Sequence, residues 1–297
     1  MVWYGFRRMM SNETMRRVVA SQRDEITEHH IYRRIAARQP LDANRRLLDR
    51  IAADELRHYE QLRSLSGRDV SPCRARVWAF DWISRILGLT FATKLLERGE
   101  AEAQEVYRAL AKDADAAQDI VREEVEHEAA LLNLLDEERL RYISSIVLGL
   151  NDALVELTGA LAGLTLALQT PRLIAVTGSI TGIAAAFSMA ASEYLSTKAD
   201  NPGRHPLKAA LYTGGAYLLT VGLLILPYLV VGHLFAALGI TLATAVLIIA
   251  LFNWYLSVVK DLPFGRRFAE MAGLSLGVAA LSFGVGYALR VLVGVDV

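Results

Sequence analysis

The segment Ile143–Leu168, ISSIVLGLNDALVELTGALAGLTLAL, is the clearest indication of the fold class in this 297-residue chain. A helix that spans a bilayer needs roughly 20 mostly apolar residues, and this stretch meets that requirement. Four further apolar stretches follow it, at Leu173–Leu195, Ala209–Val231, Leu234–Val259 and Phe268–Val293. Short polar or turn-forming breaks separate them. The pattern predicts an all-α membrane half of five transmembrane helices over residues 143–297.

The composition supports a chain of two unlike halves. The mean hydropathy is +0.28 with 53% hydrophobic residues, yet 22% of the residues are charged. Most of the charged side chains lie in residues 1–142, which predicts a charged soluble domain there. The net charge is zero and the signs are mixed, which argues against a nucleic-acid partner. The single cysteine, Cys73, excludes a disulfide framework or a Cys-rich metal site within one chain.

The distribution of Lys and Arg predicts the orientation in the cell membrane. Positive residues accumulate in cytoplasmic loops. The second and fourth loops carry Lys198, Arg204, Lys208, Lys260, Arg266 and Arg267, whereas the opposite side carries little besides Arg172. We therefore expect a cytoplasmic N-terminal domain and a C-terminus on the opposite side of the bilayer.

Polar residues inside the first two spans predict a pathway for a metal ion. Asp152 and Glu156 are four residues apart, as are Met189 and Glu193, so each pair shares a helix face. An ionisable group at membrane depth costs at least ~2.5 kcal/mol and needs a partner or a polar pathway. Carboxylates with a thioether favour a divalent transition metal over Mg²⁺ or Ca²⁺. The alternatives are that Asp152 and Glu193 snorkel to the cytoplasmic surface and that Met189 only packs.

Small residues are dense in the same two spans, for example Gly159, Gly163, Gly178 and Gly182. Small faces let helices approach closely. They predict a compact bundle and a homodimer, although ordinary helix packing is sufficient to explain most of them.

Two motifs in this half resemble a known family. The segment Gly149–Gly159, GLNDALVELTG, resembles the first transmembrane helix of the vacuolar iron transporter family, and Ser188–Ser196, SMAASEYLS, resembles its second-helix signature. The resemblance covers residues 143–297. It implies transport of ferrous iron coupled to proton exchange, with metal-handling residues at Asp152, Glu156, Met189 and Glu193. The long Glu-rich segment that plant members carry between the second and third spans is absent here.

The soluble half reads as helix almost throughout. We expect helices over Asn12–Arg38, Asp42–Leu65, Thr90–Lys112 and Ala114–Asp136, with an amphipathic segment at Arg74–Leu89. That segment is rich in aromatic residues and arginine, which suits a membrane surface or a dimer contact. A crossover helix that covers the bundle core is the equal alternative.

Acidic residues recur at matched positions of the four long helices. Glu25 precedes Tyr32 by seven residues, and the next helix holds Glu55 and His58 three residues apart. The order repeats later in the chain, with Glu100 before Tyr107 and then Glu124 with His127. Glu and His three residues apart can bind one metal together, and two such pairs with two extra Glu predict a di-iron carboxylate site. Tyr32 and Tyr107 are candidates for the shell around it.

The pattern resembles rubrerythrin, a ferritin-like protein, over residues 12–140. The resemblance implies a ferritin-like four-helix bundle that binds two irons per site, with Glu97 as an additional ligand. Glu102 or Glu105 replaces the third-helix ligands if the register slips. The paired Cys-x-x-Cys motifs of a rubredoxin module are absent. The whole chain then resembles a membrane-bound ferritin, a rubrerythrin-like domain fused to a vacuolar-iron-transporter-like membrane domain.

These observations leave three functions open. The first is export of Fe²⁺ or Mn²⁺, or another divalent transition metal, from the cytoplasm in exchange for protons, with the soluble domain capturing iron. The second is a membrane-anchored di-iron oxidase or peroxide reductase, and the third is a sensor whose bundle gates the transport path. A mere anchor needs no polar residues in its spans, so the pattern favours transport. In that reading no residue is assigned a catalytic role.

Overall fold

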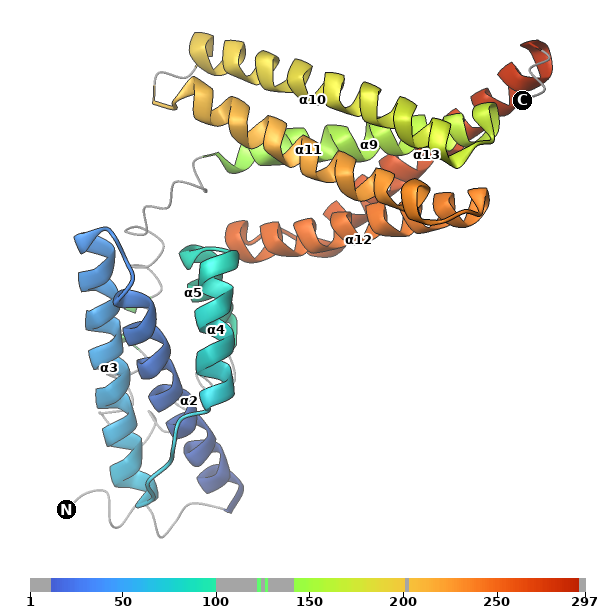
Figure 1. Cartoon of the computed structure of the whole chain (residues 1–297). Helices are drawn as coiled ribbons and strands as arrows, with labels where there is room; N and C mark the ends of the chain where they lie inside the picture. Colours follow the sequence, from blue (N-terminus) through green and yellow to red (C-terminus); the bar gives the residue numbers. More distant parts are fainter. Residues whose placement is uncertain (1–11, 100–121, 124–125, 128–141, 201–202, 294–297) are drawn as a thin grey trace. The chain divides into compact units, whose positions relative to one another are not determined.

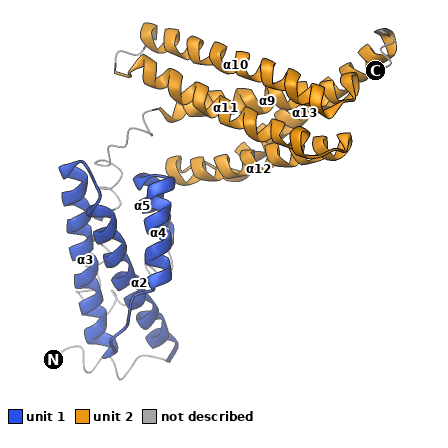
Figure 2. Ribbon diagram, in the orientation of Figure 1, with its two compact units in different colours: residues 1–137 blue, residues 138–297 orange. Residues whose placement is uncertain are grey.

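A computed structural model of the chain describes residues 12–99, 122–123, 126–127, 142–200 and 203–293. The described residues are helical with short connections, and they fall into two compact units, Met1–Glu137 and Glu138–Val297. Figure 1 shows the helices along the chain and Figure 2 shows the two units.

The N-terminal unit is built on a helical hairpin. Helices α2 (Asn12–Ala36) and α3 (Asp42–Ser66) pack side by side, and α4 (Arg74–Ile86) packs against α2. Helix α5 (Leu89–Gly99) follows α4 and contributes Ala92 and Leu96 to the core. The largest core side chains from the hairpin are Ile31, Tyr32, Ile35, Leu48 and Ile51.

Local backbone chemistry explains where these helices end. Helix α3 ends at Gly67, which has φ 63° and donates its N–H to the carbonyl of Arg63 at 2.8 Å. The segment expected at Arg74–Leu89 is helical only to Ile86, because Gly88 takes φ 99° and begins a new direction for α5. A left-handed residue of this kind interrupts a helix, and glycine adopts it at no steric cost.

Ion pairs hold α4 against α2. Asp81 is 3% exposed and is paired with Arg38, with Arg34 at 3.4 Å and with Arg85 at 3.1 Å. Arg76 of α4 reaches Asp24 at 2.6 Å and the buried Glu28 at 2.9 Å. The charged residues on this side of the hairpin therefore position α4.

The C-terminal unit contains five helices long and apolar enough to cross a membrane, as the hydropathy pattern predicts. They are α9 (Ile143–Leu168), α10 (Pro171–Asp200), α11 (Pro206–Val230), α12 (Leu234–Lys260) and α13 (Phe264–Val293). Helix α9 packs against all four others, so it is the central helix of the unit. Large apolar side chains remain exposed on the outer faces, for example Leu211, Leu219 and Leu281. This is the surface that a lipid environment would cover.

Candidate metal sites

Three buried side chains of the N-terminal unit form a group that could hold a metal ion. They are Glu25 of α2 and Glu55 and His58 of α3, and one ligand atom of each lies within 4.8 Å of the others. The Nδ1 atom of His58 is 3.5 Å from Glu25 Oε2 and 4.0 Å from Glu55 Oε2. Two carboxylates and an imidazole suit a divalent transition metal better than Mg²⁺ or Ca²⁺.

His127 extends this arrangement to a second position. Its Nδ1 is 3.8 Å from Glu55 Oε1, so the two carboxylate oxygens of Glu55 face the Nδ1 atoms of two different histidines. The His58 and His127 rings are stacked with their centroids 6.2 Å apart. His127 Nδ1 is buried and makes no hydrogen bond with any described residue. Glu55 therefore lies between the two imidazoles, with one carboxylate oxygen toward each.

Hydrogen bonds on the far side of each ring orient the two histidines. The Nε2 atom of His58 lies 2.9 Å from Glu123 Oε2, and Nε2 of His127 lies 2.9 Å from Asp54 Oδ2. An ionised carboxylate only accepts, so each Nε2 carries the proton and each Nδ1 keeps a lone pair for a metal. Histidines that bind metals are commonly oriented in this way.

Arg57 joins the two carboxylates behind the histidines. Its guanidinium reaches Asp54 at 2.7 Å and Glu123 at 2.7 Å. Burial raises the pKa of both carboxyls, but hydrogen bonds from the histidines and Arg57 outweigh burial, so both pKa values lie below their ordinary range. Both groups therefore stay ionised and hold the two imidazoles in the tautomer that metal binding needs.

The structure describes only some of the other residues predicted for this site. Tyr32 is buried in the hydrophobic core beside α3. Glu100, Tyr107 and Glu124, with the alternatives Glu102 and Glu105, lie outside the described residues, and so does the side chain of Glu97. Sequence reasoning missed Asp54, Arg57 and Glu123. Consecutive glutamates at 123 and 124 offered a signal, but the choice between them depends on how their helix is rotated.

The residues predicted for the transport pathway lie on two helices of the membrane half, α9 and α10. Glu193 of α10 is half-buried and accepts a hydrogen bond from Ser145 Oγ at 2.6 Å. Asp152 is half-buried and follows Ser145 by seven residues, which places it about 10 Å further along the helix. Glu156 lies another turn along and accepts a hydrogen bond from Tyr217 of α11 at 2.9 Å. Glu193 on α10 and then Asp152 and Glu156 on α9 thus lie at successive levels along α9.

A small network surrounds Glu193. Arg204 donates to Ser145 Oγ at 2.8 Å, and its guanidinium lies over the Tyr142 ring, 5.2 Å from the centroid. Thr197 approaches the same Glu193 oxygen at 3.5 Å. This carboxylate is therefore tied to α9 and to the connection between α10 and α11. Met189 is half-buried and packs against the hydrophobic core of the unit.

Close approach of α9 and α11 positions this network. A Cβ on Gly149 would lie 2.2 Å from the carbonyl oxygen of Thr213, and Thr213 Oγ1 donates to the Ser145 carbonyl at 3.0 Å. Gly149 therefore permits the contact that fixes the level of Ser145 against α11.

Replacing Gly149 by alanine is expected to destabilise the membrane half by ~1–3 kcal/mol, because backbone atoms must move apart. The matched control is Gly215→Ala on α11, where a Cβ meets nothing within 4 Å. Thermal unfolding of the full chain in detergent, followed by circular dichroism, measures the effect. Equal transition temperatures for the two variants would contradict the packing argument.

Comparison with known proteins places this site in context. Residues 143–203, which contain the whole of α9 and α10, match the model of the VIT family. The match covers less than half of the chain and suggests a membrane metal-ion transporter. It contains all four residues predicted for the transport pathway. No curated protein and no solved structure matches the chain significantly.

The five apolar helices and the family match together support an integral membrane protein. The described residues also hold a buried Glu–Glu–His cluster in the N-terminal unit.

Proposed function

We propose that the chain exports Fe²⁺ or Mn²⁺ from the cytoplasm in exchange for protons, and that its N-terminal unit captures or senses iron. The observation that carries this proposal is the row of carboxylates on α9 and α10, Asp152, Glu156 and Glu193, in the segment that matches the VIT family. A membrane anchor has no need of such a row, since each ionisable group is costly at membrane depth.

The spacing of these three carboxylates supports stepwise movement of a metal ion. A divalent ion in a low-dielectric pathway needs fixed negative charge at each level, and Glu193, Asp152 and Glu156 supply it at successive depths. Met189 of α10 would add a softer ligand, which favours iron-like ions. Each step then exchanges some ligands while others remain.

Proton exchange follows from the same carboxylates. Metal and proton compete for a carboxylate oxygen, so protonation from the opposite side would release the ion. The positive residues of the second and fourth loops favour a cytoplasmic N-terminal unit, which makes the expected direction outward.

The N-terminal unit is proposed to be a ferritin-like, rubrerythrin-like domain that binds two irons. Glu55 would bridge them, His58 and His127 would each give one Nδ1, and Glu25 would complete one side. Glu97, Glu100 and Glu124 are proposed to supply further carboxylates. Local metal binding on the cytoplasmic side would raise the supply to the membrane pathway.

Transport by the purified full chain in liposomes tests the proposal. Fe²⁺ flux is followed with an internal metal indicator, with a pH gradient imposed in either direction, and protein-free liposomes are the control. We expect the Fe²⁺ flux to be faster when the compartment that receives the metal is the more acidic one. Absence of Fe²⁺, Mn²⁺ and Co²⁺ movement under both gradients would overturn the transporter proposal.

A membrane-anchored di-iron oxidase or peroxide reductase is the second candidate, favoured by the burial of Glu25, Glu55 and His58. A buried site can exclude water from bound metal, which suits redox chemistry. Substitution of Asp152 separates the two functions: transport requires this residue, whereas an anchored enzyme would keep its peroxide-consuming or oxidase activity without it.

A further inference from the structure

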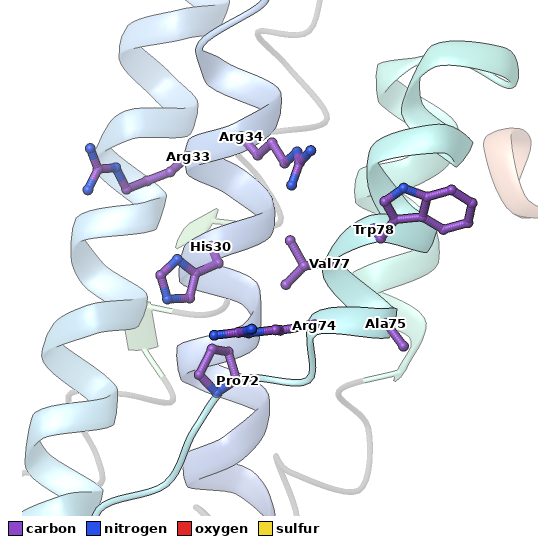
Figure 3. Close-up of a pocket in the computed structure, with 8 residues that line it drawn as sticks. All are labelled: His30, Arg33, Arg34, Pro72, Arg74, Ala75, Val77 and Trp78. Carbon is purple, nitrogen blue, oxygen red and sulfur yellow. The ribbon is translucent and has the colours of Figure 1, made fainter.

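An open pocket of about 910 Å³ lies between α2 and α4 of the N-terminal unit. Its lining includes His30, Arg33 and Arg34 from α2 and Arg74, Val77 and Trp78 from α4. In Figure 3, Arg34 extends from α2 toward α4, and Arg74 extends from the start of α4 across α2 toward His30. Arg33 points away from α4, and Trp78 lies on the outer side of α4. The pocket is separate from the Glu25–Glu55–His58 cluster, and none of its lining residues is among the predicted metal ligands.

The pocket is positively charged. Three arginines line it and no acidic residue does. Asp81, the nearest acid on α4, is already shared by Arg34, Arg38 and Arg85. Within the described part of the chain, Arg33 and Arg74 take part in no ion pair. The site therefore has an unbalanced positive charge that an anionic ligand would satisfy.

The pKa of His30 is affected by burial and by the same positive charge. Burial lowers its pKa, and the neighbouring His29 and Arg33 lower it further. The imidazole is consequently neutral near pH 7 and can donate or accept one hydrogen bond without adding charge. The pocket thus combines guanidinium groups with one neutral polar ring, a set that matches the oxygens of a phosphate.

An apolar stripe continues from the pocket along the exposed face of α4. Trp78, Trp82 and Ile86 follow one another at intervals of four residues and are 60%, 44% and 63% exposed. The Trp78 and Trp82 rings meet edge to face at 5.9 Å, and Arg85 lies over the Trp82 ring. The opposite face of the helix carries Val77, Phe80 and Ile83, which pack against the core.

We propose that this pocket binds the phosphate of an anionic phospholipid while the stripe lies in the bilayer interface. Trp78 belongs to both features, so one ligand with a phosphate and an adjoining apolar body fits them together. Tryptophan and arginine on one helix face are typical of interfacial helices. The same chain carries five helices able to span a membrane, so a lipid surface is always available to it. The inference does not rest on the transport proposal.

Tryptophan quenching in the full chain tests this proposal. Of the four tryptophans, Trp3 and Trp254 are first replaced by phenylalanine, which leaves Trp78 and Trp82 as reporters. The protein is reconstituted into phosphatidylcholine vesicles that contain brominated phosphatidylglycerol, or brominated phosphatidylcholine at the same bromine content. We expect quenching roughly twofold stronger or more with the anionic lipid.

The double variant Arg33→Gln/Arg74→Gln should abolish the difference between the two lipids. The matched control, Arg46→Gln/Arg50→Gln on the exposed face of α3, removes the same charge and should preserve it. Equal quenching by both lipids would overturn the proposal, and so would the absence of quenching by either lipid. If quenching is absent and Trp78 cross-links form between chains, the stripe is a dimer contact. Loss of the lipid preference upon addition of inorganic phosphate, with quenching otherwise unchanged, would assign the pocket to free phosphate instead.

Discussion

Replacing Asp152 by alanine is expected to reduce Fe²⁺ flux through the reconstituted chain by roughly 100-fold, which corresponds to ~3 kcal/mol of lost ion stabilisation. In the proposed pathway this residue would supply both a ligand and the fixed charge at the level between Glu193 and Glu156. Glu193→Ala should have a similar effect, because it removes the carboxylate that Ser145 orients at 2.6 Å.

Isosteric variants separate the charge from the packing. Asp152→Asn and Glu193→Gln keep the size and most hydrogen bonds of these side chains, and should still lose most of the flux. The matched control is Glu270→Gln, because Glu270 is an exposed membrane-half carboxylate whose partner is Arg266 on its own helix. We expect Glu270→Gln to transport normally. Unimpaired flux in Asp152→Asn would show that this charge does not lie on the ion path.

Combined replacement of Glu55 and His58 by alanine is expected to abolish tight metal binding by the N-terminal unit. Glu55 faces both histidines, so its loss removes a ligand from both proposed metal positions at once. Titration of Fe²⁺ or Co²⁺ into the full chain, in an Asp152→Asn background that weakens the membrane pathway, measures the stoichiometry. We expect two high-affinity metal ions per chain before the substitutions and none after them.

Glu60→Ala is the matched control for that experiment, since Glu60 lies on the exposed face of the same helix. It should leave the stoichiometry unchanged. Flux by the Glu55→Ala/His58→Ala variant should persist with a lower apparent affinity, because the bundle acts before the membrane pathway. Unchanged metal binding after both substitutions would contradict the assignment of this site.

The hydrophobic pattern was sufficient to predict the membrane half. The first span begins at Ile143 and ends at Leu168 both in the apolar run and in the structure, and all five predicted spans are helices of membrane-spanning length. Only the ends differ: α10 continues from the expected Leu195 to Asp200. A bilayer-length apolar run has few alternatives to a helix, because backbone groups in lipid must bond within their own segment.

The end of helix α4 at Ile86 was not predicted by the hydrophobic pattern. Apolar residues continue through Leu87 and Leu89, so periodicity alone extends the helix to Leu89. The backbone at Gly88 decides otherwise with its positive φ, and α5 begins as a separate helix. Glycine can adopt either a helical or a left-handed backbone conformation. The left-handed conformation at Gly88 lets α5 place Ala92 and Leu96 in the core.

The amino-acid pattern was enough to predict the two unlike halves, the five spans, and the candidate ligands Glu25, Glu55 and His58, which the fold brings within 4.8 Å of one another. These follow from composition and from spacing within single helices, which are local properties. The three-dimensional packing was needed to show that Glu123 and Asp54 orient the histidines, that Ser145 holds Glu193 and that Tyr217 bonds Glu156. Those contacts join different helices. The rotation of each helix and the close packing between helices determine which side chains meet, and a one-dimensional pattern contains neither.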